Sequence, residues 1–315
     1  EKRGIKALTA GLMAIAAGDS VVASKQAKRA SSLLRGSPLA LVLGAQAAQL
    51  SGDAARAKSV FETMCEHDET AFMGYRGLMN QALEAGDITK ALALGGQAQA
   101  FQPDAPWLVN ELVALNIRAE SYGDALRLQE KAIRRRMDDP QKAKQRLAEI
   151  LMLECHQLWQ NKDYDQALRK AREALQADDT NRDAQMACGR LLASSGAIRK
   201  AQKLLMRAWE RDPNLELARA LGEAFPPETA ADEKLKKMQK LLASNPEHIS
   251  AQLILAEMAI ASQEWQMART QLDAILAKGD HPHAFRLMAQ LEEGTSADIA
   301  LAHKWLQRAT DFKDT

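Results

Sequence analysis

The sequence has few of the residues on which disulfide, metal and membrane-spanning structures depend. Only three of its 315 residues are cysteine, and Cys65, Cys155 and Cys188 lie far apart with no Cys-x-x-Cys pair. This spacing argues against a disulfide framework and against a zinc ribbon, and it fits a reducing compartment best. The longest apolar run, residues 38–50, contains two glutamines and is shorter than the roughly 20 apolar residues that cross a bilayer. We therefore expect no membrane span within the chain.

An excess of charge of either sign is also missing. Lysine and arginine number 42 against 41 aspartates and glutamates, whereas a nucleic-acid-binding domain is expected to be clearly basic, so nucleic acid is not an expected partner. The sequence has no His-Glu-x-x-His motif, no nucleophile elbow and no glycine-rich phosphate loop. We therefore expect no enzyme activity, no catalytic residue, no resident metal and no required cofactor.

The composition that remains favours helices. Aromatic residues make up only 4% of a chain that is 46% apolar, so its core must be built mainly from alanine, leucine and methionine. Small residues also recur at a fixed period. Intervals of 34 residues separate most members of a set that we call the register alanines, although one interval is 42 and another is 67. The set is Ala23, Ala57, Ala91, Ala125, Ala167, Ala201, Ala268 and Ala302.

The period indicates pairs of short antiparallel helices. Each register alanine is expected where the second helix of a pair crosses the first, because only a small side chain lets the two backbones approach. In Gly86-Asp87, glycine accepts a positive φ at the end of one helix and aspartate caps the next. Neither helix buries its apolar stripe alone, so successive pairs must stack.

This order of spacing, small residues, turn and closing proline resembles the tetratricopeptide repeat. It predicts an all-α fold without a sheet, a right-handed α-solenoid of about nine helix pairs. The 42-residue interval predicts two lobes, residues 1–140 with four pairs and residues 141–315 with about five. One pair near residues 222–245 should be degenerate, because Pro226-Pro227 interrupt it and Lys234 occupies the register position.

A narrower resemblance is carried by "GIKALTAGLMAIAAGDSVVASKQAKRASSL" at residues 4–33 and by "YRGLMNQALEAGDITKALALGGQAQAFQPDAPW" at residues 75–107. These segments resemble the repeat domain of bacterial HemY proteins, which are associated with heme biosynthesis. The resemblance implies a bacterial inner-membrane protein with two transmembrane helices before Glu1 and this repeat domain on the cytoplasmic side. It also implies that the chain helps to organise late heme-synthesis enzymes, such as ferrochelatase. It carries over no active-site residue.

Candidate binding residues follow from the repeat register. The first helices of such pairs line the concave face, and their inward positions lie 15 and 11 residues before a register alanine, with some one turn further along. Side chains there could clamp a bound peptide through hydrogen bonds and charge-assisted pairs. The alternative is ordinary solvated helix surface. The predicted partner-binding set is Arg76, Asn80, Asn110, Arg118, His156, Trp159 and Arg190.

Two further features allow competing interpretations. Cys155-His156 and His281-Pro282-His283 are the only local pairs of axial heme ligands, but both cysteines Cys155 and Cys188 fall in packing positions. The segment 131–146 holds seven basic residues against two acidic ones. It is either a ridge that touches anionic lipid or a charged, exposed helix.

The sequence thus predicts a non-catalytic protein-protein interaction scaffold for heme-pathway enzymes, tethered to the membrane by segments outside this chain. Two alternatives stay open. One is a general tetratricopeptide assembly factor for envelope or respiratory proteins, and the other is a heme or porphyrin carrier.

Overall fold

The computed structural model describes residues 1–295 and 299–311, and within these residues it contains 18 α-helices and no strand. The chain divides into two compact units, Glu1–Ile150 and Leu151–Thr315. The division falls inside a helix, Pro140–Gln160, whose first residue is at the lobe boundary that the sequence predicts. Each unit is described by itself below.

The first unit consists of four complete helix pairs and the first half of a ninth helix. Its helices are α1 (Lys2–Ala16), α2 (Ser20–Leu33), α3 (Pro38–Leu50), α4 (Ala54–Cys65), α5 (Asp68–Glu84), α6 (Ile88–Phe101), α7 (Pro106–Arg118), α8 (Tyr122–Arg134) and α9 (Pro140–Gln160).

The second unit begins within α9 and contains the other half of the repeats. Its remaining helices are α10 (Tyr164–Ala177), α11 (Arg182–Ser194), α12 (Ile198–Arg211), α13 (Leu215–Glu223), α14 (Ala231–Leu241), α15 (Ile249–Ala261), α16 (Trp265–Leu276), α17 (Pro282–Thr295) and α18 (Ile299–Asp311).

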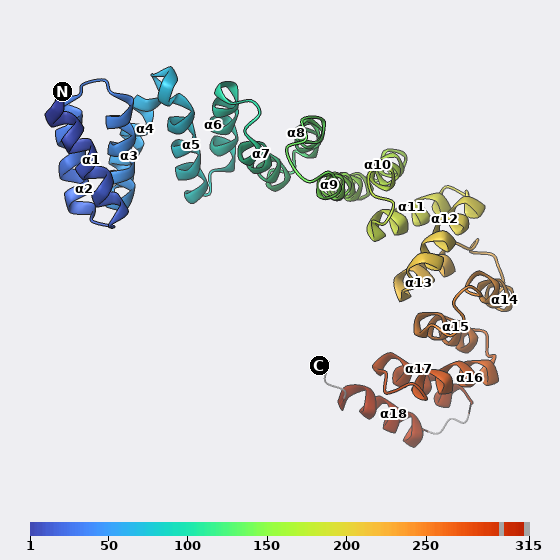
Figure 1. Cartoon of the computed structure of the whole chain (residues 1–315). Helices are drawn as coiled ribbons and strands as arrows, with labels where there is room; N and C mark the ends of the chain where they lie inside the picture. Colours follow the sequence, from blue (N-terminus) through green and yellow to red (C-terminus); the bar gives the residue numbers. More distant parts are fainter. Residues whose placement is uncertain (296–298, 312–315) are drawn as a thin grey trace. The chain divides into compact units, whose positions relative to one another are not determined.

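Successive helix pairs stack in sequence order within each unit. The two helices of a pair lie side by side, as α1 with α2 and α11 with α12 (Figure 1). Several first helices of neighbouring pairs also touch. In the first unit α1 contacts α3, and in the second unit α11 contacts α13, α13 contacts α15 and α15 contacts α17. The predicted all-α stack of tetratricopeptide-type pairs is confirmed.

The register alanines occupy the crossing points that the period predicts. All eight are buried, with at most 1% of their surface exposed. Lys234, which stands at the missing register position, is only half-buried. The pair that contains it is short, with 9 residues in α13 and 11 in α14. A long side chain at the crossing point thus coincides with the degenerate pair.

The Gly-Asp turns are built as the sequence predicts. Gly86 has a φ of 74°, and the Asp87 carboxylate accepts a hydrogen bond from the Lys90 backbone N–H at 2.9 Å. Asp19 and Asp53 cap α2 and α4 in the same way. Glycine adopts a positive φ without steric clash, so Gly86 can reverse the chain direction. Asp87 then accepts a hydrogen bond from a backbone N–H group that has no partner within the following helix.

The eight extra residues of the 42-residue interval lengthen a helix. They extend α9, which has 21 residues and begins with proline at its first position. The carboxylate of Asp139 caps this helix by accepting hydrogen bonds from the backbone N–H groups of Gln141 at 3.1 Å and Lys142 at 3.0 Å. Proline is tolerated there because the first helical N–H groups have no partner within the helix.

Candidate functional site

The first hollow formed by predicted residues lies between α3, α4 and α5, and we call it the α3–α5 hollow. It has a volume of about 230 Å³, and its lining includes the predicted Arg76 and Asn80 together with Gln46 and Gln49. The Arg76 guanidinium lies over the ring of Trp107, 4.6 Å from its centroid. Stacking holds this cation in place at the rim while its N–H groups stay able to donate to a ligand.

The second hollow lies between two first helices of the second unit, and we call it the α9–α11 hollow. It has a volume of about 360 Å³ and combines a cation, an imidazole, an indole, a carboxylate and apolar groups. The Trp159 ring is fixed by an edge-to-face contact with Tyr164, with 5.8 Å between the centroids. The lining residues are His156, Trp159, Gln160, Asp183, Met186, Ala187 and Arg190.

The other two predicted residues lie outside both hollows. Asn110 is half-buried, and its side-chain oxygen accepts a hydrogen bond from Arg146 at 3.0 Å. Arg118 is exposed at the last turn of α7. The structure therefore brings Arg76 and Asn80 together in one unit, and His156, Trp159 and Arg190 together in the other.

Residues that the sequence reasoning missed also belong to the α9–α11 hollow. Asp183 and Gln160 line it, although neither stands at a counted inward position. The Arg190 Nε donates to a carboxylate oxygen of Glu223 at 2.8 Å, so a residue from the next pair orients this cation. Glu223 lies 33 residues after Arg190. This separation is close to one repeat period, so the repeat register could have predicted that the two side chains meet.

The cysteine of the Cys155-His156 pair does not face the hollow that His156 lines. Cys155 has no exposed surface, and burial raises the pKa of its thiol to about 11. Burial likewise raises the pKa of Cys188 to about 12. Both thiols are therefore protonated at neutral pH, which disfavours them as thiolate ligands. Within the described residues, no three His, Cys, Asp or Glu side chains gather as metal ligands.

His283, one member of the second histidine pair, belongs to a polar network that joins three first helices. Glu257 on α15 accepts hydrogen bonds from His283 Nε2 of α17 at 2.7 Å and from Arg219 Nη2 of α13 at 3.0 Å. The hydrogen bond from His283 is the main cause that lowers the pKa of Glu257, and burial opposes it. Burial, followed by the charge of His283, lowers the pKa of His281.

This network predicts a pH-dependent contribution to stability. Since the Glu257 pKa is lower in the folded chain, its stabilisation is complete above its unfolded pKa of about 4.3 and is lost as the pH falls through the folded value. We expect Glu257→Gln to lower the free energy of unfolding at pH 7 by about 1 kcal/mol, the usual contribution of such hydrogen bonds near a surface. The difference from the unmodified protein should shrink towards about pH 3. Urea unfolding at both pH values tests this, and an unchanged difference would contradict it.

Four of the seven cations in the basic segment 131–146 have ion-pair partners within the first unit. Lys131 and Arg135 both reach Asp104, at 3.5 and 3.9 Å, and Arg146 reaches Asp138 at 3.6 Å. Arg134 pairs with Glu130 along α8 at 3.6 Å. More than half of the segment's cations therefore have a counter-ion close by.

The repeat pattern and the stacked helix pairs are those of a tetratricopeptide-type fold. The tetratricopeptide repeat model matches residues 158–224. The model for the HemY protein N-terminus matches residues 1–52, which confirms the HemY resemblance over that segment. None of the helices within residues 1–295 and 299–311 combines the length and apolar character that a bilayer crossing demands.

Individual relatives are similar to parts or all of this chain. The probable magnetosome protein Mms48 of Magnetospirillum gryphiswaldense is 35% identical over 129 residues, which cover 40% of this chain and 28% of that protein. The TPR2AB domain of yeast Sti1 is 16% identical, with a TM-score of 0.40 and 98% of each chain covered. A tetratricopeptide repeat protein from Parabacteroides merdae is 12% identical, with a TM-score of 0.38, covering 81% of this chain and 94% of its own.

Proposed function

We propose that this chain is a non-catalytic scaffold that binds segments of other proteins through the first helices of its repeats. The α9–α11 hollow carries this proposal. It places Arg190 and His156 beside the ring of Trp159 and the apolar surface of Met186. Arginine and tryptophan are enriched where binding energy concentrates in protein interfaces, because each combines a large contact surface with directed hydrogen bonds.

We further propose that the partners are late heme-biosynthesis enzymes, with ferrochelatase as the first candidate. The HemY match at residues 1–52 supports this assignment. In the same proposal, segments outside this chain tether the repeats to a bacterial inner membrane on its cytoplasmic side. Tetratricopeptide folds are typically non-catalytic, which supports this part of the proposal.

A capture experiment tests the scaffold. We expect the double substitution Arg76→Ala with Arg190→Ala to weaken capture of purified ferrochelatase by at least about tenfold, because interface arginines commonly contribute more than 1 kcal/mol each. Thermal unfolding should change little, since the ion pair between Arg190 and Glu223 is exposed and such pairs contribute little to stability. Binding is measured by surface plasmon resonance on immobilised repeat domain.

The matched control removes two exposed cations from second helices, Arg127→Ala on α8 and Lys237→Ala on α14, each of which pairs with a carboxylate on its own helix. This variant should bind as the unmodified protein does. Equal binding by all three proteins would refute the role of the hollows, and no capture by the unmodified chain would refute ferrochelatase as the partner.

The two alternatives give different outcomes. Capture from membrane extracts of envelope or respiratory proteins, without heme enzymes, would favour a general assembly factor. A Soret shift on titration with heme, lost in His156→Ala, would favour a heme carrier, because His156 is the exposed member of the Cys155-His156 pair.

A further inference from the structure

The second helix α12 carries a stripe of cations that the repeat pattern did not single out. Lys200, Lys203, Arg207 and Arg211 follow at spacings of three, four and four residues, so they share one face of the helix, and all four are exposed. At 1.5 Å per residue this stripe is roughly 16 Å long. It lies on a second helix, whereas the α9–α11 hollow is formed by first helices.

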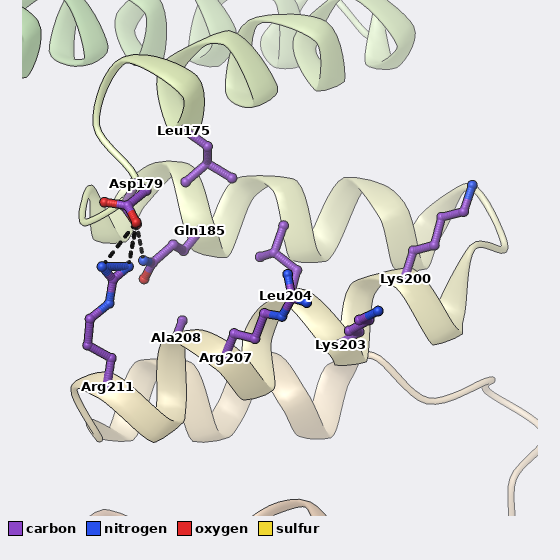
Figure 2. Close-up of a pocket in the computed structure, with 9 residues that line it drawn as sticks. All are labelled: Leu175, Asp179, Gln185, Lys200, Lys203, Leu204, Arg207, Ala208 and Arg211. Atoms are coloured by element: carbon purple, nitrogen blue, oxygen red, sulfur yellow. Dashed lines mark hydrogen bonds and ion pairs between the residues drawn. The ribbon is translucent and has the colours of Figure 1, made fainter.

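The stripe borders a hollow of about 410 Å³ between α10, α11 and α12, which we call the basic hollow. Its apolar floor includes Leu175, Leu204 and Ala208. Figure 2 shows Arg211 and Lys200 toward opposite ends of α12 with Leu204 between them, and Leu175 approaching from α10. The site thus combines a row of positive charges with a central apolar patch.

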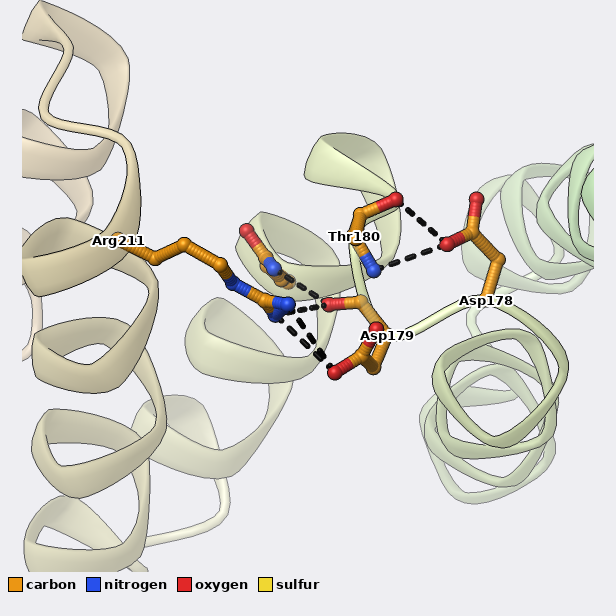
Figure 3. A network of polar contacts seen from close by, with 5 residues as sticks. Asp178, Asp179, Thr180 and Arg211 are labelled. Atoms are coloured by element: carbon orange, nitrogen blue, oxygen red, sulfur yellow. Dashed lines mark hydrogen bonds and ion pairs between the residues drawn. The ribbon is translucent and has the colours of Figure 1, made fainter.

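One end of the basic hollow is held in place by a polar network. Arg211 donates to Asp179 at three points, to the carboxylate oxygen Oδ2 at 3.1 and 3.2 Å and to the backbone carbonyl at 3.1 Å (Figure 3). Gln185 donates to the same carbonyl at 2.7 Å. The buried Asp178 accepts hydrogen bonds from the backbone N–H of Thr180 at 2.9 Å and from its hydroxyl at 2.6 Å, which orders the turn. Asp179 thereby compensates Arg211.

The other three cations of the stripe remain available. In the part of the chain that the structure describes, Lys200, Lys203 and Arg207 have no carboxylate within ion-pair distance and no side-chain hydrogen bond. By comparison, four of the seven cations of segment 131–146 reach Asp104, Glu130 or Asp138. The three unpaired cations of α12 lie in a row on one helix face, beside the apolar floor of the basic hollow.

The apolar surroundings identify the kind of ligand. Lys203 and Arg207 also line a neighbouring hollow of about 380 Å³, whose apolar groups are Met206 and Leu241. Free phosphate would leave these apolar surfaces unused, and a flat lipid surface would not enter the hollows. An extended or helical peptide can place carboxylates on the cations while its apolar side chains fill the floor.

We propose that the basic hollow is a second docking surface, which takes an acidic peptide segment of a partner protein with leucine-like side chains between its carboxylates. The proposal rests on the scaffold function, since it names a second class of segment that the repeats hold. Its recognition chemistry is charge complementarity to Lys200, Lys203 and Arg207 plus burial of apolar surface on Leu175 and Leu204.

The test is direct binding of a fluorescein-labelled peptide of repeated Glu-Glu-Leu units, followed by fluorescence anisotropy. We expect the double substitution Lys203→Glu with Arg207→Glu to weaken binding at least about tenfold, because two attractive contacts become repulsive. The same peptide with Gln in place of Glu should bind at least about tenfold more weakly to the unmodified protein, and the affinity for the acidic peptide should fall as salt rises. Circular dichroism confirms that each variant is folded.

The control is Lys25→Glu with Lys28→Glu, which makes the same change in net charge on the exposed face of the second helix α2. This variant should keep the peptide affinity. Equal loss in both double variants would overturn the proposal, because it would show a response to net charge alone. So would phosphatidylserine vesicles or inorganic phosphate that compete as well as the acidic peptide. Because no heme enzyme enters this assay, its result is independent of whether ferrochelatase is captured.

Discussion

Gly74→Ala is expected to destabilise the first unit by about 2 kcal/mol or more, although alanine normally strengthens a helix. A Cβ atom at Gly74 would lie 2.7 Å from the carbonyl oxygen of Phe61 and 2.9 Å from the backbone nitrogen of Cys65. These atoms belong to the backbone of α4, so relief requires α4 and α5 to separate. Overpacking of this kind costs roughly 1–3 kcal/mol or more, which exceeds the gain of about 1 kcal/mol from a better helix former.

Gly96→Ala is the matched control for this substitution. Gly96 is exposed within α6, and no atom outside its own helix turn lies within 4 Å of the position a Cβ would take. This variant should gain stability, by up to about 1 kcal/mol. Urea unfolding of both variants measures the contrast, and a Gly74→Ala protein as stable as the unmodified one would show that the two helices can move apart freely.

Trp209→Ala is expected to destabilise the second unit by about 3–5 kcal/mol, the range for removal of a large aromatic side chain from a core. Trp209 has no exposed surface and packs in a cluster that includes Leu205, Leu217 and Leu221. Trp209→Phe should cost less than about 1.5 kcal/mol, since most of the apolar volume remains. The indole N–H has no hydrogen-bond partner within the described residues, so the change to phenylalanine removes no hydrogen bond.

The comparison for Trp209 is Trp159→Ala. Trp159 is 36% exposed and lines the α9–α11 hollow, so its removal should affect partner capture more than stability. Thermal and urea unfolding distinguish the two tryptophans. If Trp209→Ala were no more destabilising than Trp159→Ala, the assignment of Trp209 to the core that joins neighbouring repeats would be wrong.

The helix pairs could be predicted because their determinants are local or strictly periodic. A register alanine, a Gly-Asp turn and a first-position proline each impose their geometry on a few neighbouring residues, and the 34-residue period repeats the same solution. The buried register alanines and the capping carboxylates of Asp19, Asp53 and Asp87 follow that rule. The 42-residue interval also has a local explanation, because its extra residues lengthen α9, which begins at Pro140.

The candidate site was only partly predictable. Counting residues back from a register alanine identifies the helix face on which a side chain lies, but it does not identify the side chains from other helices that it contacts. It assigned Arg76, Asn80, His156 and Arg190 to first helices, and the structure places each of them in a hollow. The same counting selected Asn110, whose side-chain oxygen already accepts a hydrogen bond from Arg146 of a different helix. The binding role of the whole set remains a prediction that the capture experiment tests.

The sequence by itself determined the repeat, the all-α fold, the turns and the positions where side chains must be small, because each depends on spacing along the chain. Only the tertiary structure decided which polar groups meet. The pairing of Lys131 with Asp104, the lack of partners for Lys200, Lys203 and Arg207, and the backbone contact at Gly74 depend on which segments of the chain come together in space. Such contacts depend on the distance between packed helices in space, which a period along the chain does not specify.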